Sequence, residues 1–282
     1  MVSAYDLQAT LAWRQSMDAA LRREEGWLSL CGLFWLAPGE NRLGTAPDCP
    51  LLLPPTSAPA HVGAIVLEGD SARFRAAPGV EALVEGAPVE TITLQPDTSA
   101  TPTRVRLGEV TFVLVQRGER RGLRVWHRTS PNRKAFPGRT WFPIRQEYVR
   151  PATFVRYDPP IPMTIVDVLG DTQIEACPGH VQFDLAGVPA RLLVTEADDD
   201  GLFLLFADAT NGDTTYPAGR FLATEAVQGD HVRLDFNRAY SPPCAFTPFA
   251  TCPLPSPENR LPMPVEAGEL FEAAWGHVPA PV

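Results

Sequence analysis

The sequence has no apolar run long enough to span a membrane. Among its 282 residues, no uninterrupted apolar stretch approaches the roughly 20 residues that a membrane-crossing helix needs. The segment from Met1 to Gln8 contains neither a basic leader nor the apolar core of a signal peptide. The lack of both features predicts a soluble, cytoplasmic protein without a membrane partner.

Common metal-binding and redox patterns are also missing. The five cysteines stand at irregular spacings without a C-x-x-C pair, which is the usual mark of a zinc site or a dithiol centre. The five histidines show neither the i, i+4 pairing nor the H-x-E context of frequent metal sites. We therefore expect reduced thiols, no metal and no cofactor.

Fingerprints of catalysis and nucleotide binding are absent as well. The chain has no G-x-S-x-G elbow, no P-loop and no G-x-G-x-x-G, so hydrolase and nucleotide functions lack their usual signatures. Its formal net charge of −9 would repel a polyanion, and nucleic acid is not an expected partner. Both an acid–base enzyme, such as a hydrolase without a standard motif, and a binding protein stay in view.

Proline is abundant and predicts a mainly β chain. The 30 prolines are about twice the usual share of roughly 5%, and they interrupt long helices. Apolar residues recur at helical spacing near the N-terminus, so residues 1–25 are expected to contain one helix. Short strand-like runs separated by turns follow at close spacing, which is typical of β-sandwiches.

Two β-domains are expected after this helix. The chain exceeds the usual domain size of roughly 100–200 residues, and the polar, turn-rich stretch from Ser130 to Gly138 suits a linker. We place a β-sandwich in residues 26–129 and a second β-sandwich or barrel in residues 130–282. From Ser241 to Pro264 prolines are too frequent for a sheet interior, which predicts an extended arm. A short helix from Val265 to Trp275 would close it.

A polar block between apolar flanks is the first candidate site. Asp208 stands where a hydrophobic strand stops, and Thr210 to Asp213 supplies turn-forming residues. A second turn from Pro217 to Gly219 would aim Arg220 back at the sheet. We predict a hairpin that presents Asp208, Tyr216 and Arg220 together.

An alternating strand follows this hairpin. Apolar and polar residues alternate from Val232 to Asn237, so Arg233, Asp235 and Asn237 share one face of a strand. Hairpin and strand together would bring two carboxylates and two arginines into one pocket. Such a group can bind a carboxylate or phosphate, or position a general base.

Two cysteines, Cys244 and Cys252, lie eight positions apart in a proline-stiffened loop. Cys244 would act as a nucleophile if a nearby cation or histidine made it a thiolate, with His180 and His231 as candidates. The alternative is that both cysteines fill space in the core. A disulfide between them is not expected in a reducing compartment.

Three stretches of the C-terminal half resemble a known family. They are Thr215-Tyr216-x-x-Gly219-Arg220-Phe-Leu, Leu234-Asp-Phe-Asn237-Arg-Ala-Tyr240-x-Pro-Pro-Cys244-Ala-Phe and Cys252-Pro-Leu-Pro-x-Pro-Glu258-Asn259-Arg-Leu261. With Trp27-Leu-x-Leu-x-Gly32-Leu-Phe-Trp-Leu36 and Trp141-Phe-Pro143, they make nearly the whole chain similar to the prokaryotic domain of unknown function family 1684. That family has no established activity, so the resemblance implies relatedness without implying a reaction.

The N-terminal half resembles, in part, a forkhead-associated β-sandwich. The matching stretches, in the expected order, are Gly39 to Gly44, Leu51 to Leu53, Ser57 to His61, Glu85-Gly86 and Leu107 to Val110. Thr45 stands where that family has an arginine, Glu85 replaces its usual asparagine, and the interval from serine to histidine is one residue longer. Because these differences remove groups that hold phosphothreonine, the resemblance implies a scaffold.

Three functions follow from these observations. In the first, the C-terminal domain binds or acts on a small anionic molecule: Arg220 holds the anion, Asp208 or Asp235 is the base, and Tyr240 is an acid or oxyanion donor. In the second, the forkhead-associated-like sandwich binds an acidic or phosphorylated peptide through Arg42, Arg73 and Arg75. In the third, the polar cluster is purely structural. The predicted site residues are Asp208, Asp235, Tyr240 and Cys244 for catalysis, and Tyr216, Arg220, Asn237 and Asn259 for substrate binding.

Overall fold

The computed structural model describes residues 6–272, and the chain divides into two compact units. The smaller unit comprises Ala19–Phe136, whereas the larger combines Met1–Asp18 with Pro137–Val282. Helix α1 (Leu7–Leu21) begins in the larger unit and ends in the smaller one. The smaller unit is thus inserted into the sequence of the larger.

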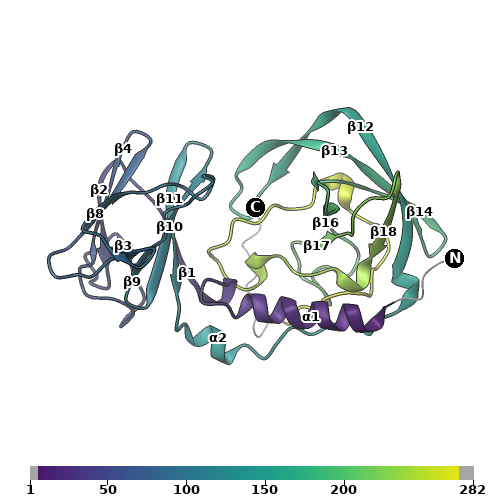
Figure 1. The fold of residues 1–282 in the computed structure, drawn as a ribbon. Coiled ribbons are helices and arrows are strands. Elements are labelled where there is room, and N and C mark those ends of the chain that lie inside the picture. The colour runs from purple at the N-terminus through teal and green to yellow at the C-terminus, as the bar shows by residue number, and fades with distance from the viewer. Residues whose placement is uncertain (1–5, 273–282) are drawn as a thin grey trace. The chain divides into compact units, whose positions relative to one another are not determined.

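Two sheets build the smaller unit (Figure 1). The six-stranded sheet has the order β1 (Leu30–Trp35), β11 (Arg120–His127), β10 (Val110–Arg117), β9 (Val105–Leu107), β6 (Leu83–Val84) and β7 (Ala87–Pro88). The five-stranded sheet has the order β3 (Leu51–Leu52), β2 (Gly39–Gly44), β4 (Gly63–Glu68), β5 (Ser71–Ala76) and β8 (Thr91–Thr93). Only β2 and β3 pair in parallel among these described strands.

Alternating side chains place the core of the smaller unit between its sheets. In β5, Ala72 and Phe74 are buried while Arg73 and Arg75 are exposed. Phe74 meets Phe112 of β10 edge to face, with ring centroids 5.3 Å apart. Because β5 and β10 belong to different sheets, this contact joins the two sheets as a sandwich.

Two further sheets build the larger unit. One has the order β14 (Val188–Leu193), β13 (Thr172–Leu185), β12 (Val149–Val166) and β18 (His231–Asp235), and the other β15 (Glu196–Ala197), β16 (Leu202–Phe206) and β17 (Arg220–Ala223). In Figure 1, β12 and β13 run side by side as two long strands. The predicted mainly β architecture is confirmed.

Aromatic rings connect the two sheets of the larger unit. Phe183 of β13 and Phe206 of β16 both contact Phe236, with ring centroids 5.6 and 5.5 Å away. All three rings are buried, and edge-to-face and tilted contacts of this kind add to the free energy gained from burying the rings. The core of the larger unit therefore lies between β13 and β16.

The proline-rich segment after Ser241 forms the predicted extended arm. Leu254 N donates to Val166 O over 2.8 Å, so the arm runs beside the end of β12. Further along, Leu261 N donates to Ala207 O over 2.8 Å, next to the end of β16. The arm thus covers the ends of strands from both sheets of the larger unit.

The prediction of a helix from Val265 to Trp275 is wrong for residues 265–272, because these residues form no helix. Val265 N donates to the Asp208 carboxylate, and Val265 O and Ala267 O accept from Arg220. Since side chains already bind these backbone groups, they are not available for the i to i−4 bonds of a helix. The rest of the predicted helix lies outside the described residues.

Helices in the described residues are short. Besides α1 they are α2 (Pro131–Ala135) and the 3₁₀ turns η1 (Trp27–Ser29), η2 (Gln146–Tyr148), η3 (Phe236–Arg238), η4 (Pro243–Ala245) and η5 (Pro257–Asn259). Within residues 6–272, none of them has the length and apolar character that crossing a membrane requires.

Candidate functional site

Asp208 and Arg220 lie together in the interior of the larger unit. Arg220 Nη2 donates to Asp208 Oδ2 over 2.7 Å, and both side chains have 0% exposure. Strand pairing explains the proximity, since Phe206 of β16 lies opposite Arg220 of β17. Burial lowers the pKa of Arg220, and the Asp208 carboxylate opposes that shift.

The second oxygen of Asp208 closes the turn that follows it. Asp208 Oδ1 accepts from Thr210 N over 2.9 Å, from Thr210 Oγ1 over 2.6 Å and from Val265 N over 3.0 Å. Asn211 Oδ1 in turn accepts from Asp208 N over 2.7 Å. One carboxylate therefore holds a turn, an arginine and the chain segment after the arm.

Asp235 and Asn237 form a second group. Asn237 donates to Asp235 Oδ1 from its side chain over 2.9 Å and from its backbone N–H over 3.1 Å. Asp235 lines a small pocket of about 120 Å³ together with Trp13 and Arg233. Arg238 Nε lies 3.6 Å from Asp235 Oδ2. Asp235 therefore lies beside a surface cavity, with a cation next to its charge.

Asn237 and Asn259 each bind both the backbone N–H and the backbone C=O of a distant residue. Asn237 Oδ1 accepts from Arg145 N, and its Nδ2 donates to Arg145 O, both over 3.0 Å. Asn259 binds Leu193 in the same way, over 2.7 and 2.9 Å. Because a carboxamide carries one acceptor and one donor group, each side chain pairs with the backbone N–H and C=O of that residue as a peptide group would.

Tyr216 and Cys244 lie together in the interior. Cys244 N donates to Cys252 Sγ over 3.2 Å, and the two cysteines are 1% and 5% exposed. A hydrogen bond from the Cys252 thiol lowers the pKa of Cys244 against the effect of burial, and the Tyr216 hydroxyl acts in the same direction. Cys244 thus has a lowered pKa but lacks the exposure of a reactive cysteine.

Tyr240 is half-buried among aromatic neighbours. Its ring meets Trp13 and Phe221 edge to face, with centroids 6.0 and 5.8 Å apart. Burial raises the pKa of Tyr240 to about 12, although the nearby Arg139 opposes that shift. At neutral pH the hydroxyl is therefore protonated and able to donate a hydrogen bond.

A pocket of about 800 Å³, which the sequence did not reveal, lies between β12, β14 and the arm. More than half of the residues that line it are apolar, among them Met163 and Leu193. Arg191 and Arg260 also line it and are exposed. Among the described residues, neither of these arginine side chains forms a hydrogen bond or an ion pair. No local motif marks these arginines, because they come from segments far apart in the sequence.

The predicted residue Asn259 supports this pocket without belonging to its lining. It stands between Glu258 and Arg260 on the arm, and its side chain binds Leu193 on β14. Since Leu193 and Arg260 line the pocket from two different walls, the Asn259 amide fixes the distance between those walls.

A chain of hydrogen bonds ends at Tyr157 in the wall of the same pocket. Tyr157 Oη lies 2.9 Å from His180 Nδ1, and Gln182 Nε2 lies 2.9 Å from His180 Nε2. An amide NH₂ only donates, so His180 accepts at Nε2 and donates from Nδ1 to Tyr157. Burial and the Arg191 charge lower the pKa of His180, which favours this neutral form. The Tyr157 hydroxyl hydrogen is therefore left for another acceptor.

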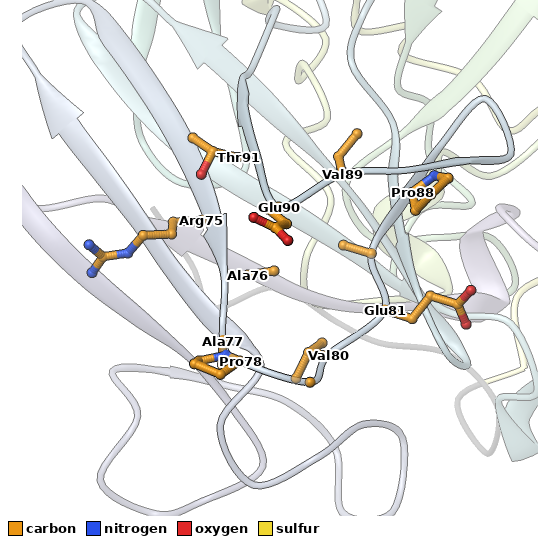
Figure 2. Close-up of a pocket in the computed structure, with 12 residues that line it drawn as sticks. Arg75, Ala76, Ala77, Pro78, Val80, Glu81, Pro88, Val89, Glu90 and Thr91 are labelled. Carbon is orange, nitrogen blue, oxygen red and sulfur yellow. The ribbon is translucent and has the colours of Figure 1, made fainter.

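The arginines of the smaller unit that were predicted to bind a peptide have different surroundings. Arg42 donates to Asp48 Oδ2 and to Asp48 O, each over 2.9 Å. Arg75 donates to Glu40 over 2.9 Å and also lines a pocket of about 830 Å³. Figure 2 shows Arg75 and Glu81 on opposite sides of this pocket. With Glu90 also in its lining, the pocket carries more negative than positive charge.

Comparison with known proteins identifies a family and several similar solved chains. Among solved structures, the chain is similar to the solution NMR structure of an uncharacterized protein of Haloarcula marismortui. The identity is 33%, the match covers 49% of this chain and 79% of that chain, and the TM-score is 0.41. No curated protein matches the chain. Residues 134–270 match the family described as "Protein of unknown function (DUF1684)", so the predicted resemblance is confirmed for this segment but not over the whole chain.

Proposed function

We propose that the larger unit binds a small molecule that combines one anionic group with an apolar part, in the pocket between β12, β14 and the arm. The observation that carries this proposal is the position of Arg191 and Arg260. Both are exposed, and within the described residues neither side chain forms a hydrogen bond or an ion pair, at a pocket with a mainly apolar lining. A guanidinium binds a carboxylate or phosphate through two parallel hydrogen bonds.

The charge of the pocket favours a singly charged ligand. Glu258 lines the pocket beside the two arginines. Its pKa is lowered, first by a hydrogen bond from its own backbone N–H and to a smaller extent by Arg191, so it is ionised at neutral pH. Two cations and one anion leave a single positive charge, which matches one carboxylate better than a phosphate dianion.

Tyr157 supplies a hydrogen-bond donor to the ligand in this proposal. The Tyr157 hydroxyl oxygen accepts a hydrogen bond from His180 Nδ1. The hydroxyl hydrogen is then able to rotate toward an acceptor on the bound ligand. A carboxylate oxygen is such an acceptor. The ligand would then be held by charge from the arginines and oriented by a neutral donor.

The buried cluster has a supporting role in this proposal. Asp208 and Arg220 have no exposed side-chain surface, and Asn259 ties the arm to β14. These residues would keep the arm in place as one wall of the pocket, which is the third of the functions weighed from the sequence. Our proposal shares with the first function the binding of a small anion by the larger unit. It assigns that binding to Arg191, Arg260 and Tyr157 in place of Arg220.

Decanoate, which joins one carboxylate to an apolar chain, is a suitable probe. We expect calorimetric titration to show binding by the wild-type chain and about tenfold or greater weakening in Arg191→Ala/Arg260→Ala. Charged hydrogen bonds contribute about 1.5–3 kcal/mol, and about 1.4 kcal/mol corresponds to a factor of ten. Decanol, which has the same chain without the charge, should bind both proteins equally.

A matched control separates the pocket from net charge. Arg73→Ala/Arg106→Ala removes two arginines that are exposed and, in the described residues, unpaired, but that belong to the smaller unit. Decanoate binding should be unchanged in this control. If the two double variants bind decanoate equally well, the pocket is not the binding site and the proposal fails.

The alternative proposal, an acidic or phosphorylated peptide bound by the smaller unit, has less support. Arg42 and Arg75 already donate to carboxylates of that unit. Loss of binding to a phosphothreonine peptide on replacing Arg42 would favour this alternative.

A further inference from the structure

Two loops of the smaller unit bring three metal-binding side chains together. Asp48 and Cys49 follow β2, and His61 precedes β4. Each offers one donor atom, and these atoms lie within 4.8 Å of one another. Cys49 and His61 are 12 positions apart, a spacing outside the usual zinc motifs, so the cluster could not be predicted from the sequence.

Backbone pairing between the two loops fixes this arrangement. Thr45 N donates to Pro59 O over 3.2 Å, and Ala46 N donates to Ala60 O over 3.0 Å. Gly44 allows the loops to approach, because a Cβ at this position would lie 2.0 Å from Ala60 O. The backbone hydrogen bonds between the two loops therefore hold Cys49 beside His61.

The distances suit a tetrahedral metal ion. Cys49 Sγ lies 3.6 Å from His61 Nδ1. Zinc bonds of about 2.3 Å to sulfur and about 2.0 Å to nitrogen place these two donors about 3.5 Å apart at a tetrahedral angle. The Asp48 and His61 side chains are 52% and 56% exposed, so their rotamers can adjust around the fixed thiol.

A neighbouring arginine orients the carboxylate of Asp48. Arg42 binds Asp48 Oδ2 and Asp48 O, while the other carboxylate oxygen, Oδ1, lies 4.0 Å from His61 Nε2. Asp48 can therefore ligate the ion itself or hold the imidazole from its outer side, as carboxylates do around many zinc sites. Either arrangement leaves at least one coordination position for water.

The same three side chains would also suit a cysteine nucleophile with a histidine base, but the setting of the thiol does not. Cys49 is 4% exposed, and its Sγ lies 3.7 Å from Ala60 O. A nucleophilic cysteine needs access to its substrate, which a thiol at this degree of burial does not have. A metal ion is small enough to reach the thiol and displaces its proton on binding.

We propose that Asp48, Cys49 and His61 form a binding site for a divalent transition-metal ion of the zinc type. One thiolate, one imidazole and one carboxylate are the ligands that zinc prefers in proteins. Binding would release the thiol proton, so the affinity should rise with pH. The site lies in the smaller unit and stands independently of the ligand proposed for the larger unit.

Cobalt is the probe for this site, because a cobalt ion bound to a thiolate absorbs in the near ultraviolet. The full chain, freed of metal by a chelator, should bind one equivalent of Co²⁺ with a thiolate charge-transfer band, and Zn²⁺ should abolish the band by displacement. The band should be lost in Cys49→Ser and retained in Cys31→Ser, which removes a partly exposed cysteine of the same unit. Absence of the band in the wild type, or its persistence in Cys49→Ser, would overturn the proposal.

The two exposed ligands provide variants that should fold. We expect His61→Gln and Asp48→Asn to weaken Co²⁺ binding at least tenfold, whereas His127→Gln, at another histidine of the same unit, should bind normally. Iodoacetamide tests the nucleophile alternative: because the Cys49 thiol is buried, its alkylation at neutral pH should be slow. Rapid labelling at neutral pH that Zn²⁺ does not slow would show a reactive thiol and count against the metal site.

Discussion

At the scale of single residues, Arg220 and Arg191 differ in what surrounds their guanidinium groups. Arg220 has 0% exposure and donates to Asp208 and to the carbonyls of Val265 and Ala267. Arg191 is exposed and, within the described residues, unpaired. A buried charge requires compensating partners, whereas an exposed, unpaired one is available to a ligand. Arg220 therefore stabilises the fold, whereas Arg191 is accessible to a ligand.

Replacing Arg220 by alanine should strongly destabilise the protein. The substitution would leave the Asp208 carboxylate buried without its cation, and breaking a buried pair in this way costs about 3–5 kcal/mol. The change in unfolding free energy can be measured by urea denaturation followed by tryptophan fluorescence. The exposed pair of Arg233 and Glu225 provides the control, since Arg233→Ala should cost at most about 1 kcal/mol.

A double variant tests the reason for this loss. Asp208→Asn/Arg220→Met removes both charges, so it should be more stable than Arg220→Ala although less stable than the wild type. Suppose that Arg220→Ala instead lowered the unfolding free energy by less than about 1 kcal/mol and abolished decanoate binding. That result would assign Arg220 the anion-binding role of the first function predicted from the sequence.

At the scale of structural elements, the turn from Tyr216 to Gly219 positions Arg220 at the start of β17. Gly219 N donates to Tyr216 O over 3.2 Å, which closes the turn. Gly219 has a φ of +90°, and a Cβ there would lie 2.5 Å from Pro255 Cγ and 2.7 Å from Phe206 O. The turn is therefore packed against both β16 and the arm.

Two glycines allow the conformational and steric parts of this effect to be separated. Gly212 has a φ of +86° with nothing within 4 Å of an added Cβ, so Gly212→Ala should cost about 1–2 kcal/mol for its backbone conformation. Gly219→Ala should cost about 1–3 kcal/mol more, because overpacking adds to the same backbone term. Urea denaturation of both variants gives the difference, and equal losses would show that the arm yields to the added methyl group.

The sequence predicts the strands of this protein well because alternation and turn residues are local signals. In β5, for example, Ala72 and Phe74 face the core and Arg73 faces out, as a two-residue period requires. The pairing of Asp208 with Arg220 was also accessible, since both flank one hairpin. Their burial was not, because the residue that covers Asp208, Val265, lies 57 positions further along the chain.

The candidate pocket shows the same limit of local information. Arg191 on β14 and Arg260 on the arm line one pocket, and Asn259, next to Arg260, binds Leu193 across 66 positions. Nothing in the neighbourhood of either arginine in the sequence resembles a motif. Sites assembled from separate strands and loops become visible once the pairing of those segments is known.

At the scale of the whole molecule, the smaller unit should fold without the rest of the chain. Ala19–Phe136 is a compact unit with its own core between two sheets, which includes Phe74 and Phe112. A domain with its own core can in principle fold alone. We expect a 19–136 fragment to unfold cooperatively in urea and to give dispersed amide signals by NMR.

A companion fragment gives the contrast. Residues 137–282 alone lack the part of α1 that belongs to the larger unit, including Arg14, which donates to Asn237 O over 3.0 Å. This fragment should be less stable than the larger unit within the full chain. If 19–136 were unfolded in isolation, the division into two independent cores would be wrong.

The insertion of one unit into the other has a consequence for how the chain is made on the ribosome. Arg14 contacts backbone carbonyls of Phe142 and Asn237, which follow it by 128 and 223 positions. At about 5–20 residues per second, Asn237 emerges roughly 10–45 s after Arg14. A 15-residue helix is marginal in water without packing, so the N-terminal segment spends this interval without its native partners while the smaller unit completes its fold. Chaperones that bind nascent chains therefore have an extended opportunity to bind the α1 segment around Arg14.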